Sequence, residues 1–287
     1  MRFLSILCVF FLLNGCVQKK DKNVDLSKVV VEEQDKEIQK QIFELFADQQ
    51  GDATSLLMVK LGTYFMSTPY VGHTLEQGEE EQLVVNLREL DCTTFVENCL
   101  ALAKTIQSGE LSFEQFVREL KNVRYRNGII DGYTSRLHYT SDWIFENQQK
   151  RLVKNVTKEI APTPYPKEIN FMSTHPDSYN QLKENPQLVD VIAQKEKDIN
   201  SRQHFFIPEQ KLAEVENLLM DGDIVGITTS IQGLDISHVG ILVRKAGRIH
   251  LLHASSLAKK VVLSDETLEE YLLNSKSATG IVVARPL

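Results

Sequence analysis

Apolar positions divide the chain into a helical first half and a strand-rich last third. Apolar side chains recur every third or fourth position, a spacing typical of helices that face a core, at residues 33–47, 53–66, 92–107 and 112–122. Short runs rich in Val, Ile and Leu follow near the C-terminus, at residues 223–227, 238–243, 248–253, 261–263 and 280–284. These runs predict an antiparallel sheet. Helices followed by strands indicate an α+β fold, with N-terminal helices packed on a C-terminal sheet.

The region between these two parts shows neither period. Residues 124–145 combine aromatic, glycine and charged residues, and residues 161–210 continue irregularly with several prolines. Long structured loops of this kind often carry function. We therefore predict one domain over residues 33–287, with an inserted loop region at about 124–210.

The first residues resemble an export signal. A positive start, Met1-Arg2, precedes an almost continuous apolar run from Phe3 to Leu13, which is too short to span a bilayer as a mature helix. Cys16 follows a small residue and resembles the lipidated cysteine of a lipobox. We expect a signal peptide at residues 1–16, a tether at 17–32, and a periplasmic protein that is anchored to a membrane through Cys16. A plain secretory signal is the alternative.

Composition and charge narrow the class of partner. The chain has 287 residues, of which 42% are hydrophobic and 25% charged, values typical of a globular protein with a real core. Its formal net charge of −7 repels phosphates, so we expect no nucleic-acid partner. We expect a monomer.

Two cysteines remain after the leader, and one of them is a candidate nucleophile. Cys92 and Cys99 lie in one predicted helix, about 10 Å apart, which is too far for a disulfide. Cys99 falls on the apolar stripe and is expected to be buried. Cys92 falls at the helix N-terminus, with Asp91 or the pair Thr94 and Glu97 as the cap. The helix dipole is expected to stabilise a thiolate at this position.

A thiolate nucleophile needs a nearby base, and two strand histidines are candidates. His238 heads one predicted strand, and His253 lies in the next. Adjacent antiparallel strands can place the two imidazoles side by side, so that one takes the proton and the other orients it. We prefer His253 to His250 because its run ends in small residues. The alternative is that these histidines only pack in the sheet.

Four motifs together resemble the NlpC-type cell-wall cysteine peptidases, which have a papain-like fold. The motifs occur in that family's order: residues 91–96 (DCTTFV), 221–225 (DGDIV), 238–241 (HVGI) and 253–254 (HA). The resemblance implies Cys92 as nucleophile, His238 as base and His253 as the orienting residue. It implies that the Tyr70 hydroxyl and the Cys92 N–H bind the oxyanion. It implies no metal and no cofactor. The usual Ser-Gly after the cysteine is Thr93-Thr94 here.

A further block resembles one branch, the anhydro-N-acetylmuramoyl-L-alanine amidases of the Bacteroides type. Residues 126–143, together with 91–97, carry this likeness. It implies hydrolysis of the amide between the muramoyl group and L-alanine in peptidoglycan fragments (muropeptides). A sugar site needs aromatic faces and forked donors. The substrate-binding candidates are Asp91, Tyr133, Arg136, Trp143 and Ser237.

Three other interpretations stay open at this point. An endopeptidase that cuts between γ-D-glutamate and diaminopimelate would use the same site. A zinc amidase would use His238, His253 and another ligand, although no compact ligand motif occurs. A lipoprotein that only binds wall fragments would show no turnover.

Overall fold

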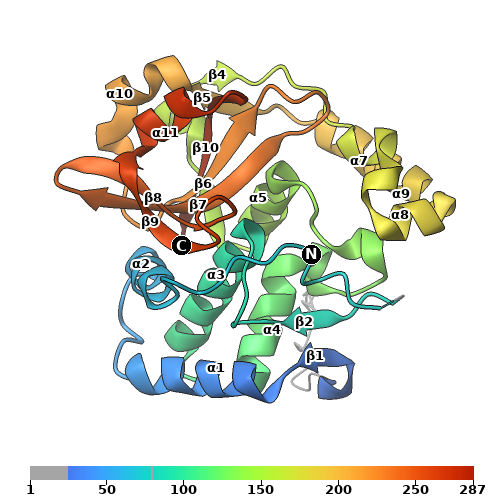
Figure 1. The fold of residues 1–287 in the computed structure, drawn as a ribbon, viewed down its shortest axis with the longest axis vertical. Coiled ribbons are helices and arrows are strands. Elements are labelled where there is room, and N and C mark those ends of the chain that lie inside the picture. Colours follow the sequence, from blue (N-terminus) through green and yellow to red (C-terminus); the bar gives the residue numbers. More distant parts are fainter. Residues whose placement is uncertain (1–24, 79) are drawn as a thin grey trace, which may run out of the picture.

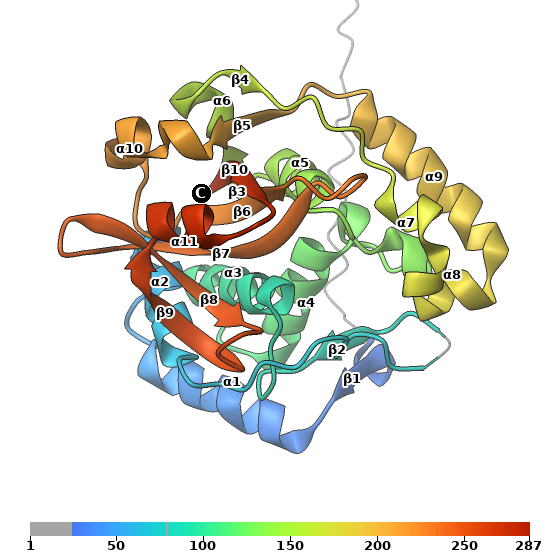
Figure 2. The ribbon, with the colours of Figure 1, turned by 45° about the horizontal axis from the view of Figure 1, so that its top comes forward.

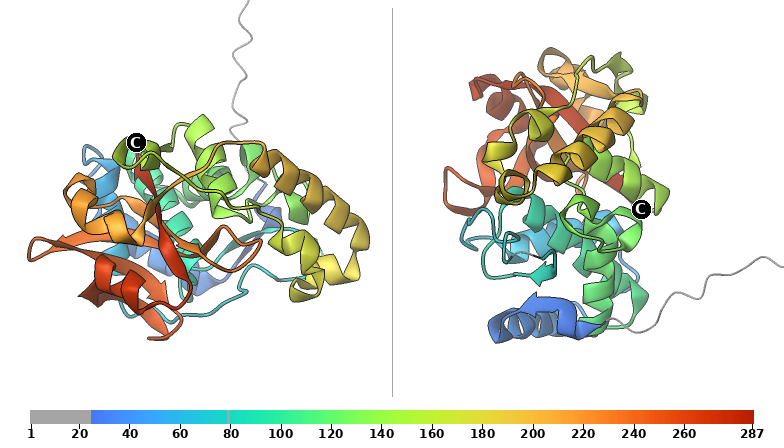
Figure 3. Two further views of the ribbon diagram at one scale, coloured as in Figure 1. Left: turned by 90° about the horizontal axis from the view of Figure 1, so that it is seen from above. Right: turned by 90° about the vertical axis from the view of Figure 1, so that its right-hand side faces the viewer.

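The computed structural model describes residues 25–78 and 80–287. The expected signal peptide, Cys16 and the first part of the tether lie outside these residues. Helices form the lower layer in Figure 1, and an antiparallel sheet forms the upper layer. The side view in Figure 3 shows the same two layers. The predicted α+β order is therefore confirmed.

The helical layer is built around one buried helix. It consists of α1 (Glu33–Leu45), α2 (Thr54–Tyr64), α3 (Cys92–Ser108) and α4 (Phe113–Arg124). These four helices match the four predicted segments to within a few residues. Helix α3 packs against α2, α4 and the sheet, and almost all of its side chains beyond the first turn are buried. Cys99 lies in that buried stretch, as expected.

The sheet has eight strands, all paired antiparallel. Its strands are β3 (Val153–Asn155), β4 (Thr163–Pro164), β5 (Phe205–Pro208), β6 (Ile224–Thr229), β7 (Ile236–Lys245), β8 (Arg248–Ser255), β9 (Lys260–Thr267) and β10 (Ala278–Pro286). The order across the sheet is β4-β5-β10-β6-β7-β8-β9, with β3 beside β10. The five predicted strands are confirmed as β6 to β10. Neighbouring strands β7 and β8 carry His238 and His253.

Several elements depart from the sequence-based expectations. Strand β1 (Val29–Val31) pairs parallel with β2 (Leu83–Val85), so the end of the expected tether belongs to the fold. The region expected to be irregular contains regular helices. These are α5 (Thr140–Gln149), α6 (Thr157–Ile160), α7 (Phe171–Thr174), α8 (Asn180–Glu184) and α9 (Pro186–Asn200), followed by α10 (Leu212–Val215) and, near the C-terminus, α11 (Leu268–Asn274).

Three hydrophobic clusters hold these elements together. The largest lies between the helical layer and one face of the sheet. A second covers the other face of the sheet, beneath α11. A third is small and joins α7, α8 and α9 to Tyr133 and Tyr139. Figure 2 shows these three helices together at one side of the molecule. Within the described ranges, no helix is both long and apolar enough to cross a bilayer.

Candidate active site

Cys92 is the first residue of α3, and a capping box fixes it there. The Asp91 side chain accepts a hydrogen bond from the Thr94 N–H at 2.7 Å, and the Thr94 hydroxyl accepts one from the Asp91 N–H at 2.9 Å. The sequence allowed two N-caps for this helix, and the structure uses Asp91. Glu97 instead forms a buried ion pair with Arg124, with Nε and Oε2 2.6 Å apart.

The two strand histidines lie side by side, as predicted. His238 pairs with Ile227 across the β6–β7 ladder, and His253 pairs with Val262 across β8–β9. Their rings are 4.8 Å apart at 84°, and His238 Nε2 lies 2.6 Å from His253 Nδ1. His250 is engaged elsewhere, because its Nδ1 lies 3.0 Å from the Ser264 carbonyl oxygen. The choice of His253 over His250 therefore agrees with the geometry.

Groups from two other segments lie near the Cys92 thiol. The backbone N–H of Val239, the residue after His238, hydrogen-bonds to the sulfur. Tyr70 comes from the loop after α2, where its N–H donates to the Lys259 carbonyl at 2.9 Å. Burial raises the pKa of Tyr70, and the nearby Cys92 raises it further. Val239 and Tyr70 therefore lie near the Cys92 thiol, and Tyr271, which Cys92 also affects, packs on both histidines.

The thiol at this site is neutral in the free protein. Burial raises the pKa of Cys92 to about 11, and the neighbouring Asp91 carboxylate acts in the same direction. Hydrogen bonds from Val239 and Thr93 lower that pKa only in part. The expected thiolate is therefore wrong for the free protein, because burial and the cap charge outweigh the helix terminus.

The two imidazoles are neutral as well. Burial lowers the pKa of His238 to about 3, with a further contribution from His253. Burial also lowers the pKa of His253 to about 4. With Nε2 of His238 committed to His253, Nδ1 is the nitrogen of His238 that remains for another partner.

Tyr271 packs on both imidazoles and was missed by sequence reasoning. It lies on α11, with its ring 5.7 Å from that of His253 at 88° and 6.3 Å from that of His238 at 26°. The signal for this helix was present, since Thr267 and Glu270 form a capping box at its start. No pattern in the sequence indicated that its tyrosine faces the histidines.

A cleft of about 530 Å³ begins at the N-terminus of α3. Asp91 and Thr93 line it at this helix terminus. Residues 133–138 form one wall, and residues 178–181, up to the start of α8, form another. The block that was predicted to be functional therefore faces the helix terminus that carries Cys92.

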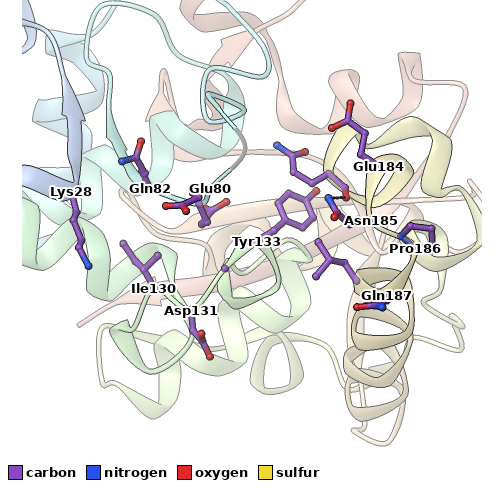
Figure 4. A pocket seen from close by; sticks show the side chains of 14 residues that line it. Lys28, Glu80, Gln82, Ile130, Asp131, Tyr133, Glu184, Asn185, Pro186 and Gln187 are labelled. Atoms are coloured by element: carbon purple, nitrogen blue, oxygen red, sulfur yellow. Dashed lines mark hydrogen bonds between the residues drawn. The ribbon is translucent and has the colours of Figure 1, made fainter.

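A second cavity of about 810 Å³ shares Tyr133 and Gln181 with the cleft. Figure 4 shows Tyr133 near the middle of this cavity. Glu80 and Gln82 lie on one side of it, and Asn185 and Pro186 on the other. The two hollows therefore adjoin at Tyr133.

Three of the five substrate-binding candidates, Asp91, Tyr133 and Arg136, line the cleft. Arg136 is only 7% exposed and pairs with Glu76 at 2.8 Å and Glu81 at 3.4 Å. Its guanidinium carbon lies 5.1 Å from the centre of the Tyr133 ring. Asp91 also lines the cleft, although its carboxylate caps α3.

The other two candidates lie elsewhere. Trp143 belongs to the main core and is 5% exposed, and it lines a small neighbouring recess and not the cleft itself. A sugar contact of its ring stays a prediction. Ser237 is exposed beside His238, with Oγ 3.4 Å from the Ile227 carbonyl oxygen, and is not part of the cleft lining.

The described part of the chain holds no group of three His, Cys, Asp or Glu side chains placed to bind a metal ion.

Known proteins resemble this chain over most of its length. The model of the N-acetylmuramoyl-L-alanine amidase-like family (AmiA-like) matches residues 60–281. A crystal structure of an N-acetylmuramoyl-L-alanine amidase from Bacteroides uniformis is 39% identical, with a TM-score of 0.78 over 81% of this chain and 98% of that one. A structure from Bacteroides fragilis, provisionally named a xylanase, is 42% identical, with a TM-score of 0.76 over 79% and 99%.

A Legionella pneumophila protein shares the fold alone, at 22% identity and a TM-score of 0.66 over 88% of this chain and 95% of that one. The comparison with curated protein sequences gives no match. The family match and the Bacteroides structures each cover well over half of the chain. The chain therefore belongs to the N-acetylmuramoyl-L-alanine amidase-like family.

Proposed function

We propose that the protein is a cysteine amidase that hydrolyses the bond between the muramoyl group and L-alanine in peptidoglycan fragments. The observation that carries this proposal is the contact of 2.6 Å between His238 Nε2 and His253 Nδ1. The next residue after His238, Val239, donates its backbone N–H to the Cys92 thiol. This arrangement supplies a nucleophile, a base and a group that orients the base. The same arrangement fits the papain-like fold that the sequence motifs imply.

The first chemical step begins from neutral groups. His238 Nδ1 takes the thiol proton as the Cys92 sulfur attacks the amide carbonyl carbon, so the sulfur–carbon bond forms without a stored thiolate. His253 Nδ1 accepts the Nε2–H hydrogen bond of His238 and stabilises the imidazolium that results. This direction of proton transfer requires His238 to be protonated on Nε2 in the free protein.

The remaining steps return the groups to their starting state. The oxyanion is held by the Cys92 N–H and the Tyr70 hydroxyl. As the carbon–nitrogen bond breaks, His238 gives its proton to the leaving amine of L-alanine. Water, deprotonated by His238, then attacks the thioester and releases the muramoyl acid and the Cys92 thiol.

The choice of bond follows from the relatives. The family and the Bacteroides uniformis structure are both named for N-acetylmuramoyl-L-alanine amidase activity. The cleft, with the neighbouring outer cavity, gives room for a fragment larger than a single residue. We propose released muropeptides as the substrate, bound along the wall that carries Tyr133 and Arg136.

Glycoside hydrolysis, suggested by the name of the Bacteroides fragilis relative, fits this cleft poorly. Such enzymes use two carboxyl groups that flank the bond. Here Glu76 pairs with Arg136, Glu97 pairs with Arg124, and Asp91 caps α3. Each carboxylate in the cleft lining is thus engaged by a neighbour. Release of reducing sugar from xylan would contradict the amidase proposal.

We also propose export to the periplasm and a lipid anchor at Cys16. This rests on the leader sequence alone. Labelling of cells with a radioactive fatty acid should mark the wild-type protein and leave a Cys16→Ala variant unlabelled. Equal labelling, or none in either protein, would contradict the lipid anchor.

Digestion of one purified anhydro-muropeptide, followed by product masses, tests the proposed bond. An amidase releases the complete stem peptide and the free sugar acid. An endopeptidase that cuts after γ-D-glutamate would instead leave L-alanine and D-glutamate on the sugar. If the chain only binds wall fragments, the mass of the substrate would stay unchanged.

A further inference from the structure

A small recess opens from the cleft beside Cys92. Its volume is about 30 Å³. It shares four lining residues with the cleft, namely Thr93, Glu97, Leu137 and His138. The recess is therefore a side chamber of the cleft.

The recess lies next to the reacting sulfur. Two of its lining residues, Thr93 and Val239, also hydrogen-bond to the Cys92 thiol. A substrate carbonyl under attack by this sulfur must come within bonding distance of it. The groups attached to that amide then lie at the mouth of the recess.

The walls of the recess are mainly apolar and fixed. Five of its side chains belong to the main core: Val96, Leu137, Trp143, Ile224 and Val239. Its two ionisable side chains are engaged elsewhere. Glu97 pairs with Arg124 at 2.6 Å, and His138 Nε2 lies 2.9 Å from the Tyr133 carbonyl oxygen. Such walls favour a small apolar group of fixed size.

The volume limits what can enter. A cavity of roughly 10–15 Å³ is already enough for one water molecule, so about 30 Å³ admits one group of one or two heavy atoms. Resting on the proposed function, we propose that the recess binds the single methyl branch on a carbon next to the scissile amide. That methyl is carried by L-alanine on one side of the bond and by the lactyl group on the other.

Water is the competing occupant. The Trp143 Nε1 atom is buried and has no hydrogen-bond partner in the described structure, and it belongs to a residue that lines the recess. A permanently bound water would leave the recess without influence on substrate choice. The experiment must therefore measure selectivity and not binding alone.

Two series of synthetic muropeptides identify the methyl that enters. In one series, L-alanine is replaced by glycine or by L-norvaline, which carries a propyl group. In the other, the lactyl group is replaced by its analogue without the methyl or with a propyl. In one of the two series, kcat/KM should favour the methyl substrate over the unbranched one by roughly 10- to 200-fold, and the propyl substrate, whose three carbons exceed the recess, should also be poor.

Variants of Val96 then change the size of the recess. Val96→Ala enlarges it and should shift selectivity toward the propyl substrate by roughly tenfold or more. Val96→Ile fills it and should remove the advantage of methyl over hydrogen. Val117→Ala is the matched control, because Val117 is a buried valine of the same core on α4 that does not line the recess. It should keep the wild-type selectivity.

The outcomes separate this inference from the proposed function. Cleavage of the muramoyl–alanine bond with equal kcat/KM for all branches in both series would overturn the proposed role of the recess. A preference that the Val96 variants leave unchanged would overturn it too. Cleavage of none of the substrates by the wild-type protein would overturn the proposed function itself.

Discussion

The Cys92 thiol lies between groups with opposite effects on its ionisation. The Asp91 carboxylate and burial raise its pKa, while the Val239 amide and Thr93 lower it. The first two dominate, so the proton stays on sulfur until a base removes it. At the residue scale, reactivity therefore depends on His238 and on the substrate, and not on a permanent thiolate.

This balance predicts a distinctive alkylation profile. The rate at which iodoacetamide modifies Cys92, followed by peptide mapping, should be low at pH 7 and should still rise above pH 9. Asp91→Asn should lower the apparent pKa of this profile, because it removes the charge while asparagine remains a good N-cap. A maximal rate already reached at pH 6 would show a stored thiolate and contradict the neutral site.

The sequence could predict the thiol and three groups near it but not their protonation. Cys92, His238 and His253 follow from residue type, capping and strand order, which are local signals, whereas Tyr70 follows from the family resemblance alone. The pKa values and the inward turn of Trp143 depend on burial, which only the packed fold decides. The position of Cys92 at a helix N-terminus predicted the effect of the helix dipole on its pKa, but the larger effect of burial could not be seen in the sequence.

At the scale of elements, α11 ties the far face of the sheet to the histidine pair. Leu268 and Leu272 anchor it in the second core, and Thr267 with Glu270 caps it. This fixes the Tyr271 ring against both imidazoles. Other groups near the histidines are Cys92 with Asp91, Tyr70, and Glu266, whose charge acts on Tyr271.

Replacing Tyr271 tests whether its ring positions the histidines. Tyr271→Leu should lower kcat on the order of 10- to 100-fold with little change in KM, because His238 loses its fixed orientation. The acid limb of the pH–rate profile should move to higher pH as the imidazoles become more hydrated. Tyr271→Phe keeps the ring and should retain activity, as should Leu273→Ala on the exposed side of the same helix. Equal loss in the Phe variant would contradict a role for the ring alone.

Helix α3 is held in place by a buried ion pair. Arg124 of α4 donates to Glu97 at 2.6 Å and to the Val84 carbonyl at 2.7 Å, which links α3, α4 and β2. Both charged side chains are almost inaccessible, at 1% and 3% exposure.

Breaking this pair should be costly. Arg124→Met leaves the Glu97 carboxylate buried without its partner, so the free energy of unfolding should fall by about 3–5 kcal/mol in urea denaturation. The double variant Glu97→Leu with Arg124→Met should recover much of that loss, because no unpaired charge remains. Equal stability of the single variant and the wild type would show that the pair does not anchor α3.

Sequence patterns predicted the elements that carry strong periods and missed the others. Helices α1 to α4 and strands β6 to β10 have clear apolar stripes or runs. Helix α9 begins at Pro186 and buries few apolar side chains, so its period is weak. Strand β1 is three residues long and gains its place only by pairing with β2, across more than fifty residues of chain.

At the scale of the whole molecule, stability should depend on buried neutral histidines. Burial lowers the pKa of His138 and of His238 to about 3, and that of His253 to about 4, against 6.5 as the ordinary value. Between pH 6.5 and about 3, the unfolded chain binds protons that the folded chain does not. The stabilisation is complete above pH 6.5 and is lost progressively as the pH falls through this window.

Unfolding measurements across that window check this expectation. The urea midpoint should fall steadily from pH 7 to pH 4.5. His138→Asn, outside the catalytic group, should flatten part of the slope. A midpoint that stays constant down to pH 4.5 would contradict the burial of these imidazoles in their neutral form.

The most direct test of the account is turnover of one anhydro-muropeptide by two matched cysteine variants. Both Cys92 and Cys99 lie on α3, the first at its start and the second buried in its apolar stripe. Cys92→Ala should bind the muropeptide and release no stem peptide, whereas Cys99→Ala should keep turnover close to that of the wild type. Release of the stem peptide by Cys92→Ala at the wild-type rate would contradict the cysteine mechanism.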